Sequence, residues 1–368
     1  NPNKSLLIER YKSLKLKLKK DPLMMDFINY YDDLDPFLYV KDAGSLLNFS
    51  FKISPNLKEK FLNNFIERSL DFLKVFSLEL NNGKRVYENI LLLELINDYL
   101  SLVPKGFLDI NLYYNNIKDL YNINLSKDEL DSIINNLNFG FHTEKFNKKI
   151  IPLQEIFQIK NIYIENQKIY LTQDFISLLD NKIFIKYLLD SLKYSIWLFN
   201  KNFKDKIFEK GFFLYEKYSR KDIFRILNWE KNPLANAVGG YILDLRSQMP
   251  VFINFYKDEK SINYNNALMG RDKITWVSKP LRGFDSKEIK YLLNFNNKLD
   301  YMPLFIRKYN SLQNETQEFF YMGKLIPIKD SIKSCIIYDK NSKEKKAIEA
   351  IFRLDTPIEE DIFKYLVY

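Results

Sequence analysis

Cysteine and histidine are nearly absent from this sequence of 368 residues, which contains one of each, Cys335 and His142. A single cysteine cannot form a disulfide bond within the chain, and it is typical of a reducing compartment, so we expect a cytoplasmic location. With one histidine and one cysteine, a zinc site would need mainly carboxylate ligands, which is unusual. The sequence therefore indicates neither a disulfide framework nor a zinc centre.

Glycine and proline are also scarce, with 10 and 12 residues, which excludes collagen-like and low-complexity stretches. No run of 18 apolar residues occurs, so the sequence predicts no membrane-spanning helix and no membrane partner. The first four residues, Asn-Pro-Asn-Lys, contain neither a methionine nor the apolar core of a signal peptide. We therefore expect the chain to be a fragment of a longer protein.

Several catalytic motifs are missing as well. No Gly-x-x-x-x-Gly-Lys-Ser/Thr loop is present, so we expect no ATPase core in this chain. His142 is followed by Thr, Glu and Lys, a spacing one residue too wide for the His-x-Lys motif of phospholipase-D nucleases. Ser–His–Asp chemistry would have to use the same histidine, and nothing near it supports that. We expect no catalytic residue, no bound metal and no cofactor in this chain.

A carboxylate–metal nuclease stays open as an alternative. Such sites combine an acidic residue with a Glu-x-Lys motif to hold magnesium and polarise a water molecule. The sequence has two such combinations: Glu288 and Lys290 after Asp272 and Asp285, and Glu344 and Lys346 after Asp330 and Asp339. The first lies in an expected helix over 286–293 and the second in an expected turn, whereas this kind of site usually needs a strand.

Apolar and aromatic residues are plentiful, with 46% hydrophobic residues, 30 Phe and 25 Tyr, so disorder is not expected. The length allows two or three domains. Residues 1–200 contain 26 basic and 25 acidic residues, whereas residues 201–368 contain 30 and 22. The basic second half favours contact with a polyanion, although solvated lysines on exposed faces explain the charge equally well.

The first half has the pattern of a mostly helical domain. Ser54-Pro55 precedes apolar residues at three- and four-residue steps, and Ser126 and Glu129 have the form of a capping box. A hairpin is predicted over 162–171, so helix, helix and hairpin permit a winged-helix arrangement, although simple packing gives the same pattern. A long apolar helix over 183–199 leads to a boundary near residue 205, which divides the chain into domains 1–204 and 205–368.

Beyond this boundary the apolar period changes toward two, which indicates strands. We predict strands at 241–245, 251–256, 304–307, 319–322, 334–338 and 346–354. The expected fold class is α+β: a mostly helical N-terminal half followed by a twisted, barrel-like mixed β domain with helices.

Aromatic and basic residues between positions 218 and 279 form the candidate site. Alternation along 251–256 places Val251, Ile253 and Phe255 on a core face, opposite two aromatic residues and an amide that suit a flat base. The predicted base pocket contains Phe252, Asn254, Tyr256, Tyr264, Trp276 and Ser278. For Trp276 in particular, half-buried packing is the alternative.

Phosphate contacts are predicted beside this pocket. Ser219 is expected to cap a helix that begins at Arg220, with Asp222 as the acidic partner. A helix N-terminus next to two basic residues favours phosphate. The predicted contacts to the DNA backbone are Tyr218, Ser219, Arg220, Lys221, Lys257, Lys279 and Arg307.

An ordered series of segments resembles a known domain. The segments are Tyr-Ser-Arg-Lys-Asp at 218–222, Leu-Asn-Trp at 227–229, Pro-Val-Phe-Ile at 250–253, Thr-Trp-Val-Ser at 275–278, Leu-Phe-Ile-Arg at 304–307 and Phe-Tyr-Met-Gly at 320–323, with Lys257 and Tyr264. Over residues 210–330 the series is similar to the C-terminal domain of SauUSI-like type IV restriction enzymes. Those enzymes join a phospholipase-D nuclease, a helicase motor and a reader of modified DNA.

The resemblance implies that this chain is the specificity portion of an ATP-dependent restriction endonuclease that acts in phage defence. It implies an SRA-like domain that recognises 5-methylcytosine or 5-hydroxymethylcytosine in double-stranded DNA by base flipping. Residues 1–204 would couple this reader to helicase and nuclease domains of the same polypeptide, which would use ATP and magnesium. A protein-interaction module and the carboxylate nuclease stay open as alternatives.

Overall fold

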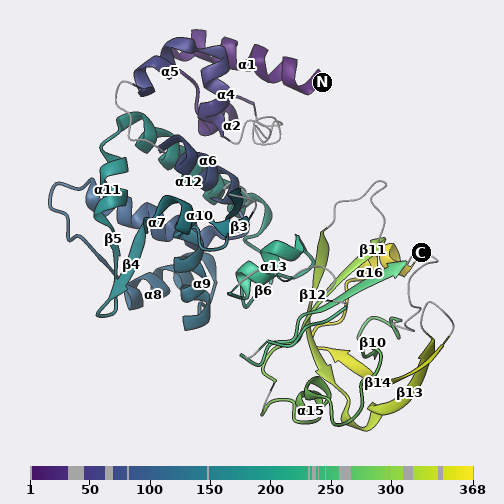
Figure 1. Cartoon of the computed structure of the whole chain (residues 1–368). Helices are drawn as coiled ribbons and strands as arrows, with labels where there is room; N and C mark the ends of the chain where they lie inside the picture. The colour runs from purple at the N-terminus through teal and green to yellow at the C-terminus, as the bar shows by residue number, and fades with distance from the viewer. Residues whose placement is uncertain are drawn as a thin grey trace. The chain divides into compact units, whose positions relative to one another are not determined.

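The computed structural model describes residues 2–31, 45–62, 69–80, 83–146, 149–230, 233, 238, 240–244, 246–256, 267–297, 299–309, 318–338 and 343–367. The chain separates into two compact units, Asn1–Lys206 and Ile207–Tyr368, and each is described by itself (Figure 1). The first unit is mostly helical and the second contains a mixed sheet, so the α+β class expected from the sequence is confirmed. No helix in the described residues combines the length and hydrophobicity needed to cross a lipid bilayer.

Helices dominate the N-terminal unit. They are α1 (Pro2–Leu18), α2 (Met24–Tyr30), α4 (Leu46–Ile53), α5 (Pro55–Leu62), α6 (Ser69–Leu80), α7 (Val86–Tyr99), α8 (Ile110–Tyr121), α9 (Lys127–Leu137), α10 (Leu153–Phe157), α11 (Gln173–Leu179) and α12 (Lys182–Asn202). The short strands are β1 (Leu108–Asp109), β2 (Thr143–Phe146), β3 (Lys149–Pro152), β4 (Ile162–Glu165) and β5 (Lys168–Leu171).

Local signals in the sequence determine where several of these helices begin. Pro55 is the first residue of α5, and Ser126 and Glu129 form the predicted capping box of α9. The long apolar helix expected over 183–199 is α12, which packs against α2, α6 and α7. Its apolar face therefore forms the centre of the unit's core.

The N-terminal unit contains a three-stranded sheet in the order β1-β5-β4. The predicted hairpin is β4 and β5, and its turn residues Asn166 and Gln167 have φ angles of 49° and 61°. Strand β5 also pairs with β1, which directly precedes α8. Helices α8 and α9 thus follow β1, and β2, β3 and α10 lie between α9 and the hairpin, so the winged-helix arrangement stays a prediction.

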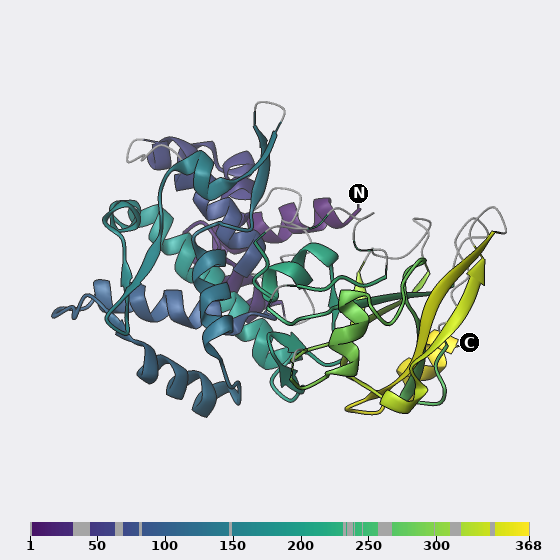
Figure 2. The same cartoon turned by 60° about the horizontal axis from the view of Figure 1, so that its bottom comes forward.

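Strands dominate the C-terminal unit. They are β6 (Phe208–Glu209), β7 (Phe212–Phe213), β8 (Lys217–Tyr218), β9 (Val251–Tyr256), β10 (Lys273–Val277), β11 (Pro303–Tyr309), β12 (Phe319–Pro327), β13 (Lys333–Tyr338) and β14 (Glu344–Leu354). The helical elements are α13 (Arg220–Ile226), α15 (Lys287–Leu293), η2 (Lys329–Ser331) and α16 (Glu360–Val367). Figure 2 shows β13 and β14 as a long twisted ribbon, in yellow.

The main sheet has the order β10-β14-β12-β11-β9, with β13 paired to β14 and β8 paired to β12. Strands β9 and β11 are parallel, while β11 and β12 are antiparallel. In the described residues β9 and β10 lie at the two ends of this path and do not pair with each other. The barrel-like closure expected from the sequence is therefore not formed, and the sheet is open.

The strand predicted at 241–245 is also wrong. Only Tyr241 makes a bridge, to Val251, and residues 242–244 are not in a strand. The reason is a turn in which Asp244 donates its backbone N–H to Gln248 and Ser247 adopts a φ of 63°. Residue 245 lies outside the described residues.

Apolar side chains cover both faces of the β9–β11–β12 region. One cluster, the first core, includes Val251, Ile253 and Leu304. The second core includes their sequence neighbours Phe252 and Phe305, which point to the opposite face. Both faces of these strands are therefore covered by packed side chains. A binding surface has to lie at the edge of one of the two cores.

Candidate nucleic-acid interface

Two arginines lie over aromatic rings at the edge of the second core. Arg220 is the first residue of α13, and its guanidinium carbon lies 5.6 Å from the ring centroid of Phe252 and 5.9 Å from that of Phe319. Arg307, from β11, lies 4.6 Å from the centroid of Phe319. One phenyl ring thus contacts two guanidinium groups, each within cation–π distance.

Strand pairing brings these residues together. Tyr218 of β8 is in register with Phe319 of β12, which positions the start of α13 beside that ring. Ser219 caps α13 as predicted, because its side chain accepts the backbone N–H of Asp222 at 3.1 Å. On the other side, the parallel pairing of β9 and β11 places Asn254 opposite Arg307.

Asn254 is hydrogen-bonded to one arginine of this pair. The Nε of Arg307 donates to the Oδ1 of Asn254 at 2.6 Å. The Asn254 side chain is half-buried at the edge of the sheet, on the same face of β9 as Phe252. We call Arg220, Asn254, Arg307 and their aromatic floor, Phe252 and Phe319, the arginine cluster.

Partial burial and mutual repulsion raise the energy of the two charges. Burial lowers the pKa of Arg220, and burial followed by the positive charge of Arg220 lowers the pKa of Arg307. Among the described residues, the Nε of Arg220 has no hydrogen-bond partner. Two like charges in a half-desolvated position are stabilised by an anion that both can reach. A guanidinium fork matches the oxygen geometry of phosphate, so phosphate suits this cluster.

The other predicted backbone contacts are placed differently. Tyr218 is buried, and its hydroxyl accepts the backbone N–H of Phe213 at 2.8 Å, so its role here is structural. Lys221 is exposed next to Arg220. Lys279 lies beside Tyr241, away from the arginine cluster. Lys257 lies outside the described residues.

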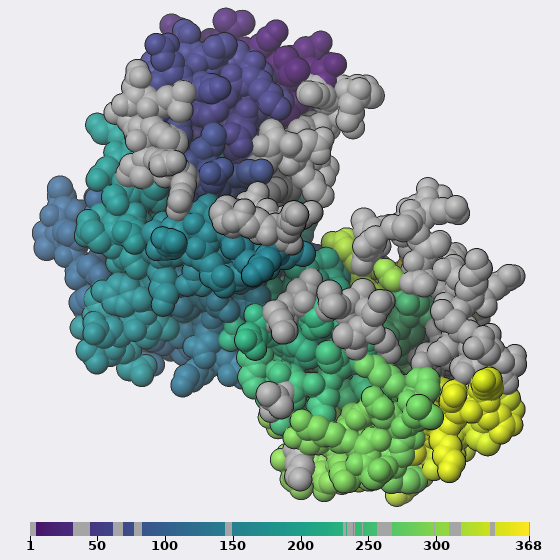
Figure 3. Space-filling model, viewed as in Figure 1, coloured from purple at the N-terminus to yellow at the C-terminus, as the bar shows by residue number. Residues whose placement is uncertain are grey.

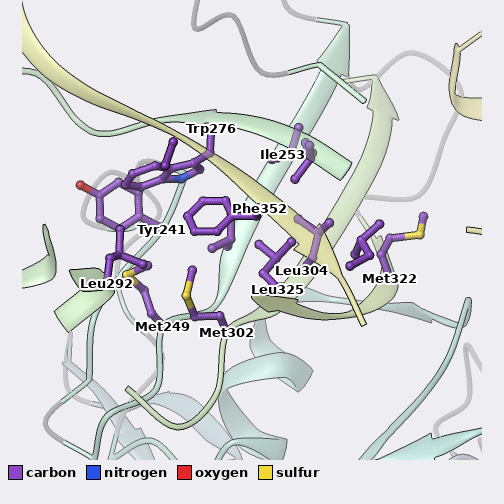
Figure 4. Packing of buried hydrophobic residues seen from close by; sticks show 14 of the residues in the cluster. Tyr241, Met249, Ile253, Trp276, Leu292, Met302, Leu304, Met322, Leu325 and Phe352 are labelled. Atoms are coloured by element: carbon purple, nitrogen blue, oxygen red, sulfur yellow. The ribbon is translucent and has the colours of Figure 1, made fainter. Parts of the chain in front are cut away.

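The predicted base pocket is not assembled as one open surface. Phe252 is 6% exposed and stacks on Phe305 with 5.5 Å between ring centroids, in the second core. Trp276 is 2% exposed and contacts Tyr241 and Phe352 in the first core (Figure 4). The expectation that these two rings share an exposed wall fails because each belongs to a different packed core.

Ser278 is also buried, and its hydroxyl accepts the backbone N–H of Ile348 at 2.9 Å. This bond joins the end of β10 to β14, which is a structural role. The side chain of Tyr256 and all of Tyr264 lie outside the described residues, so their predicted roles stay predictions. Of the four pocket residues that the structure describes, Phe252 and Asn254 belong to the arginine cluster, whereas Trp276 and Ser278 do not.

Phe319 is the residue of the arginine cluster that the sequence reasoning did not include. Its strand was predicted over 319–322, but no role was assigned to its ring. The sequence contains one relevant signal: Arg307 ends an apolar strand, Leu304-Phe-Ile-Arg307, which indicates a charged group at the edge of a core. Only the pairing of β12 with both β8 and β11 shows that the two arginines meet over this ring.

The two glutamates of the nuclease alternative are placed differently. Glu344 is the first residue of β14 and pairs with Tyr338, so it does not lie in the expected turn. The Oε1 of Glu288 accepts from Arg282 at 2.5 Å and from the Tyr241 hydroxyl at 3.1 Å, on α15 as expected. The ammonium of Lys279 lies 4.9 Å from the Tyr241 ring, and burial and then Arg282 lower its pKa. In the residues that the structure describes, no three His, Cys, Asp or Glu side chains form a group that could hold a metal ion.

His142 is buried in the N-terminal unit. Its Nε2 lies 3.2 Å from the Oδ1 of Asn136, and its ring makes an edge contact with Phe139. These contacts are those of a packing residue, which agrees with the absence of a matching His-x-Lys motif.

Residues 7–205, more than half of the chain, match the family model described as "Domain of unknown function (DUF8090)". The chain belongs to this family. Residues 212–366 match a second model, "Domain of unknown function (DUF3427)". The two matches fall one in each structural unit. No curated protein matches the sequence.

Two solved structures have weak similarity to the chain. One is "DNA modification-dependent restriction endonuclease AspBHI", with 10% identity and a TM-score of 0.25, over 34% of this chain and 65% of that one. The other is "DNA recognition domain of the cytosine modification-dependent restriction endonuclease LpnPI", with 13% identity and a TM-score of 0.24, over 32% and 61%. The match spans less than two thirds of either structure, and likenesses of this size do not establish a shared fold.

Proposed function

We propose that the C-terminal unit binds double-stranded DNA and recognises a modified cytosine, 5-methylcytosine or 5-hydroxymethylcytosine. The observation that carries this proposal is the arginine cluster, in which Arg220 and Arg307 share the ring of Phe319. Two half-buried guanidinium groups beside each other favour a bound phosphate, and the unit's excess of basic over acidic residues attracts a polyanion.

Phosphate contacts position a protein on DNA, whereas contacts to the bases give specificity. Asn254 is the proposed base contact, because its amide lies at the sheet edge and is fixed by Arg307. The chain continues from Asn254 into Tyr256 and Tyr264, which we propose as the remaining pocket residues, and into Lys257, which we propose as a contact to the DNA backbone. Stacking on aromatic rings, about 1–3 kcal/mol per base, would offset the few kcal/mol needed to extrude a base from the duplex.

The ordered motifs from Tyr218 to Gly323 support a wider proposal. The chain would be the specificity portion of an ATP-dependent type IV restriction endonuclease, with an SRA-like reader. Its N-terminal unit would couple the reader to helicase and nuclease domains of the same polypeptide. Those domains would use ATP and magnesium in the cytoplasm.

Fluorescence anisotropy with duplexes that differ in one cytosine tests this function. Arg220→Ala should weaken binding to modified and unmodified duplexes by the same factor, about tenfold, since phosphate carries no sequence information. Arg307→Ala should weaken binding to both duplexes and also reduce the preference for the modified one, because it releases the amide of Asn254. Asn254→Ala should reduce the preference for the modified duplex and leave the weaker nonspecific binding intact. Arg353→Ala is the matched control, because Arg353 is an exposed arginine on β14.

Two results would contradict the proposal. One is failure of the unaltered protein to bind any duplex. The other is an equal affinity for modified and unmodified duplexes, which would leave a DNA-binding unit without a reading function.

A further inference from the structure

A hollow in the N-terminal unit contains none of the residues of the arginine cluster. Its volume is about 620 Å³, and its charged lining residues are Lys15, Lys19, Lys20, Lys60, Lys186 and Asp21. The lining residues alone, five lysines and one aspartate, carry a net charge of +4. This concentration of one sign distinguishes the hollow from an ordinary mixed surface.

The lysines come from three separate parts of the chain. Lys15 lies in the last turn of α1, Lys19 and Lys20 follow that helix, Lys60 lies on α5 and Lys186 on α12. The purple atoms of α1 reach the surface in Figure 3. Residues 1–20 contain seven basic residues and one acidic residue, although residues 1–200 are almost neutral. The near-zero charge of the whole half therefore hides a strongly basic segment.

The single lining carboxylate does not neutralise the hollow. Asp21 is 2.7 Å from the ammonium of Lys15, and it also accepts hydrogen bonds from Ser54 at 3.0 Å and from Tyr11 at 3.2 Å. Lys20 pairs with Asp26 at 3.1 Å. The side chains of Lys19 and Lys186 are exposed at the hollow. A positive field is the result.

The chemistry of the lining indicates which anion fits. No aromatic ring and no arginine lines the hollow, so it offers neither a stacking surface for a base nor a planar fork. Lysines are compact charges on flexible stems, which suit several closely spaced phosphates without a fixed orientation. Both a nucleic-acid backbone and a small polyphosphate have this chemistry.

We propose that this hollow binds the sugar–phosphate backbone of DNA, as a second contact that is independent of base sequence. The choice of DNA over a small polyphosphate rests on the function proposed above. DNA contact is then shared by both units, in contrast to the division that the overall charges of 1–200 and 201–368 suggest.

The test uses the full chain with Lys19→Ala, Lys60→Ala and Lys186→Ala combined. Binding to modified and unmodified duplexes is measured by anisotropy over a series of salt concentrations. Loss of three phosphate contacts should reduce the slope of log K against log salt by about 2.7, at about 0.9 per contact. Affinity at about 0.1 M salt should fall about tenfold or more, with an unchanged ratio between the two duplexes.

The matched control combines Lys74→Ala, Lys118→Ala and Lys193→Ala, which removes the same charge from exposed positions that do not line the hollow. Its salt slope should stay close to that of the unaltered protein. Equal slopes for the two triple variants overturn the inference. Circular dichroism melting of both variants establishes that each is folded.

A second measurement separates this inference from the proposed function. Isothermal titration with inorganic tripolyphosphate is performed on the unaltered protein and on both triple variants. One outcome is that the unaltered protein binds tripolyphosphate but no duplex, and that the Lys19, Lys60 and Lys186 triple variant loses the tripolyphosphate binding. DNA is then the wrong ligand, and both this inference and the proposed DNA-reading function are overturned. If the hollow variant alone loses duplex affinity while the preference for modified DNA persists, the inference and the reader are both supported.

Discussion

Trp276 is enclosed by Tyr241 and Phe352, so its substitution tests folding before it tests binding. Trp276→Ala should lower the free energy of unfolding by about 3–5 kcal/mol, because the change leaves a cavity in the first core. Trp276→Phe keeps an aromatic ring in the core and should lower the free energy of unfolding by a smaller amount. Urea denaturation followed by circular dichroism measures both. A stable Trp276→Ala protein with lost preference for modified DNA would instead restore Trp276 to the base pocket.

Asp190 is a buried carboxylate of the N-terminal unit that joins α12 to α2. It accepts the backbone N–H groups of Met24 at 2.6 Å and Met25 at 3.1 Å, and it is 4% exposed. Burial raises its pKa to about 6 despite these two hydrogen bonds, which lower it, and the neighbouring charges are Asp26 and Lys193. At neutral pH the folded protein therefore carries an ionised group in an unfavourable position.

The sign of the pH dependence follows from this raised pKa. Between pH 4 and 6 the folded state holds more protons than the unfolded state, so the free energy of unfolding falls as the pH rises through this range. The raised pKa of Asp190 corresponds to a decrease in the free energy of unfolding on the order of 3 kcal/mol between low and neutral pH. Asp190→Asn should flatten this part of the profile. Urea denaturation at pH 4.5 and 7 measures the difference, and an equal slope in both proteins would contradict the assignment.

Elements defined by local signals were predictable from the sequence. The capping box at Ser126 and Glu129, the hairpin at 162–171 and the long helix α12 each depend on residues within a few positions of one another. The strand predicted at 241–245 failed because its apolar residues contact the core from a turn. Apolar alternation alone does not distinguish a strand from a turn whose apolar residues contact the core.

The hairpin turn offers a test at this scale. Asn166 and Gln167 both have positive φ angles, and glutamine is strained there whereas glycine is not. Gln167→Gly should raise the free energy of unfolding by about 0.5–1 kcal/mol. Glu165→Gly, an exposed strand position beside it, should lower that free energy. A higher melting temperature for Gln167→Gly and a lower one for Glu165→Gly would confirm the turn. A lower melting temperature for both variants would contradict it.

At the scale of the whole molecule, the site was predictable only in part. Arg220, Asn254 and Arg307 were identified as residue types that suit DNA, but nothing near them in the sequence brings them together. Their meeting depends on the register of β8 with β12 and of β9 with β11, which are pairings between distant segments. The same pairings fill both faces of the sheet and enclose Phe252, which alternation along one strand could not reveal.

Catalysis is the last property to be tested on the whole chain. The sequence has no phosphate-binding loop, and Glu288 on α15 is bonded to Arg282 and Tyr241. A carboxylate fixed by an arginine is a poor ligand for magnesium, because the arginine would have to be displaced first. We therefore expect methylated plasmid DNA to stay covalently intact after incubation with this chain, ATP and magnesium or manganese.

Gel electrophoresis of the plasmid and release of inorganic phosphate from ATP measure these two activities. Binding should be detected in the same samples, so that an inactive preparation is distinguished from a non-catalytic one. Metal-dependent nicking that disappears in Glu288→Ala or Glu344→Ala would replace the reader with a carboxylate nuclease. Nicking that survives both substitutions would point to a contaminant, and repurification would remove it. Intact DNA in a sample that binds it would leave cleavage to the nuclease domain that we propose for the parent polypeptide.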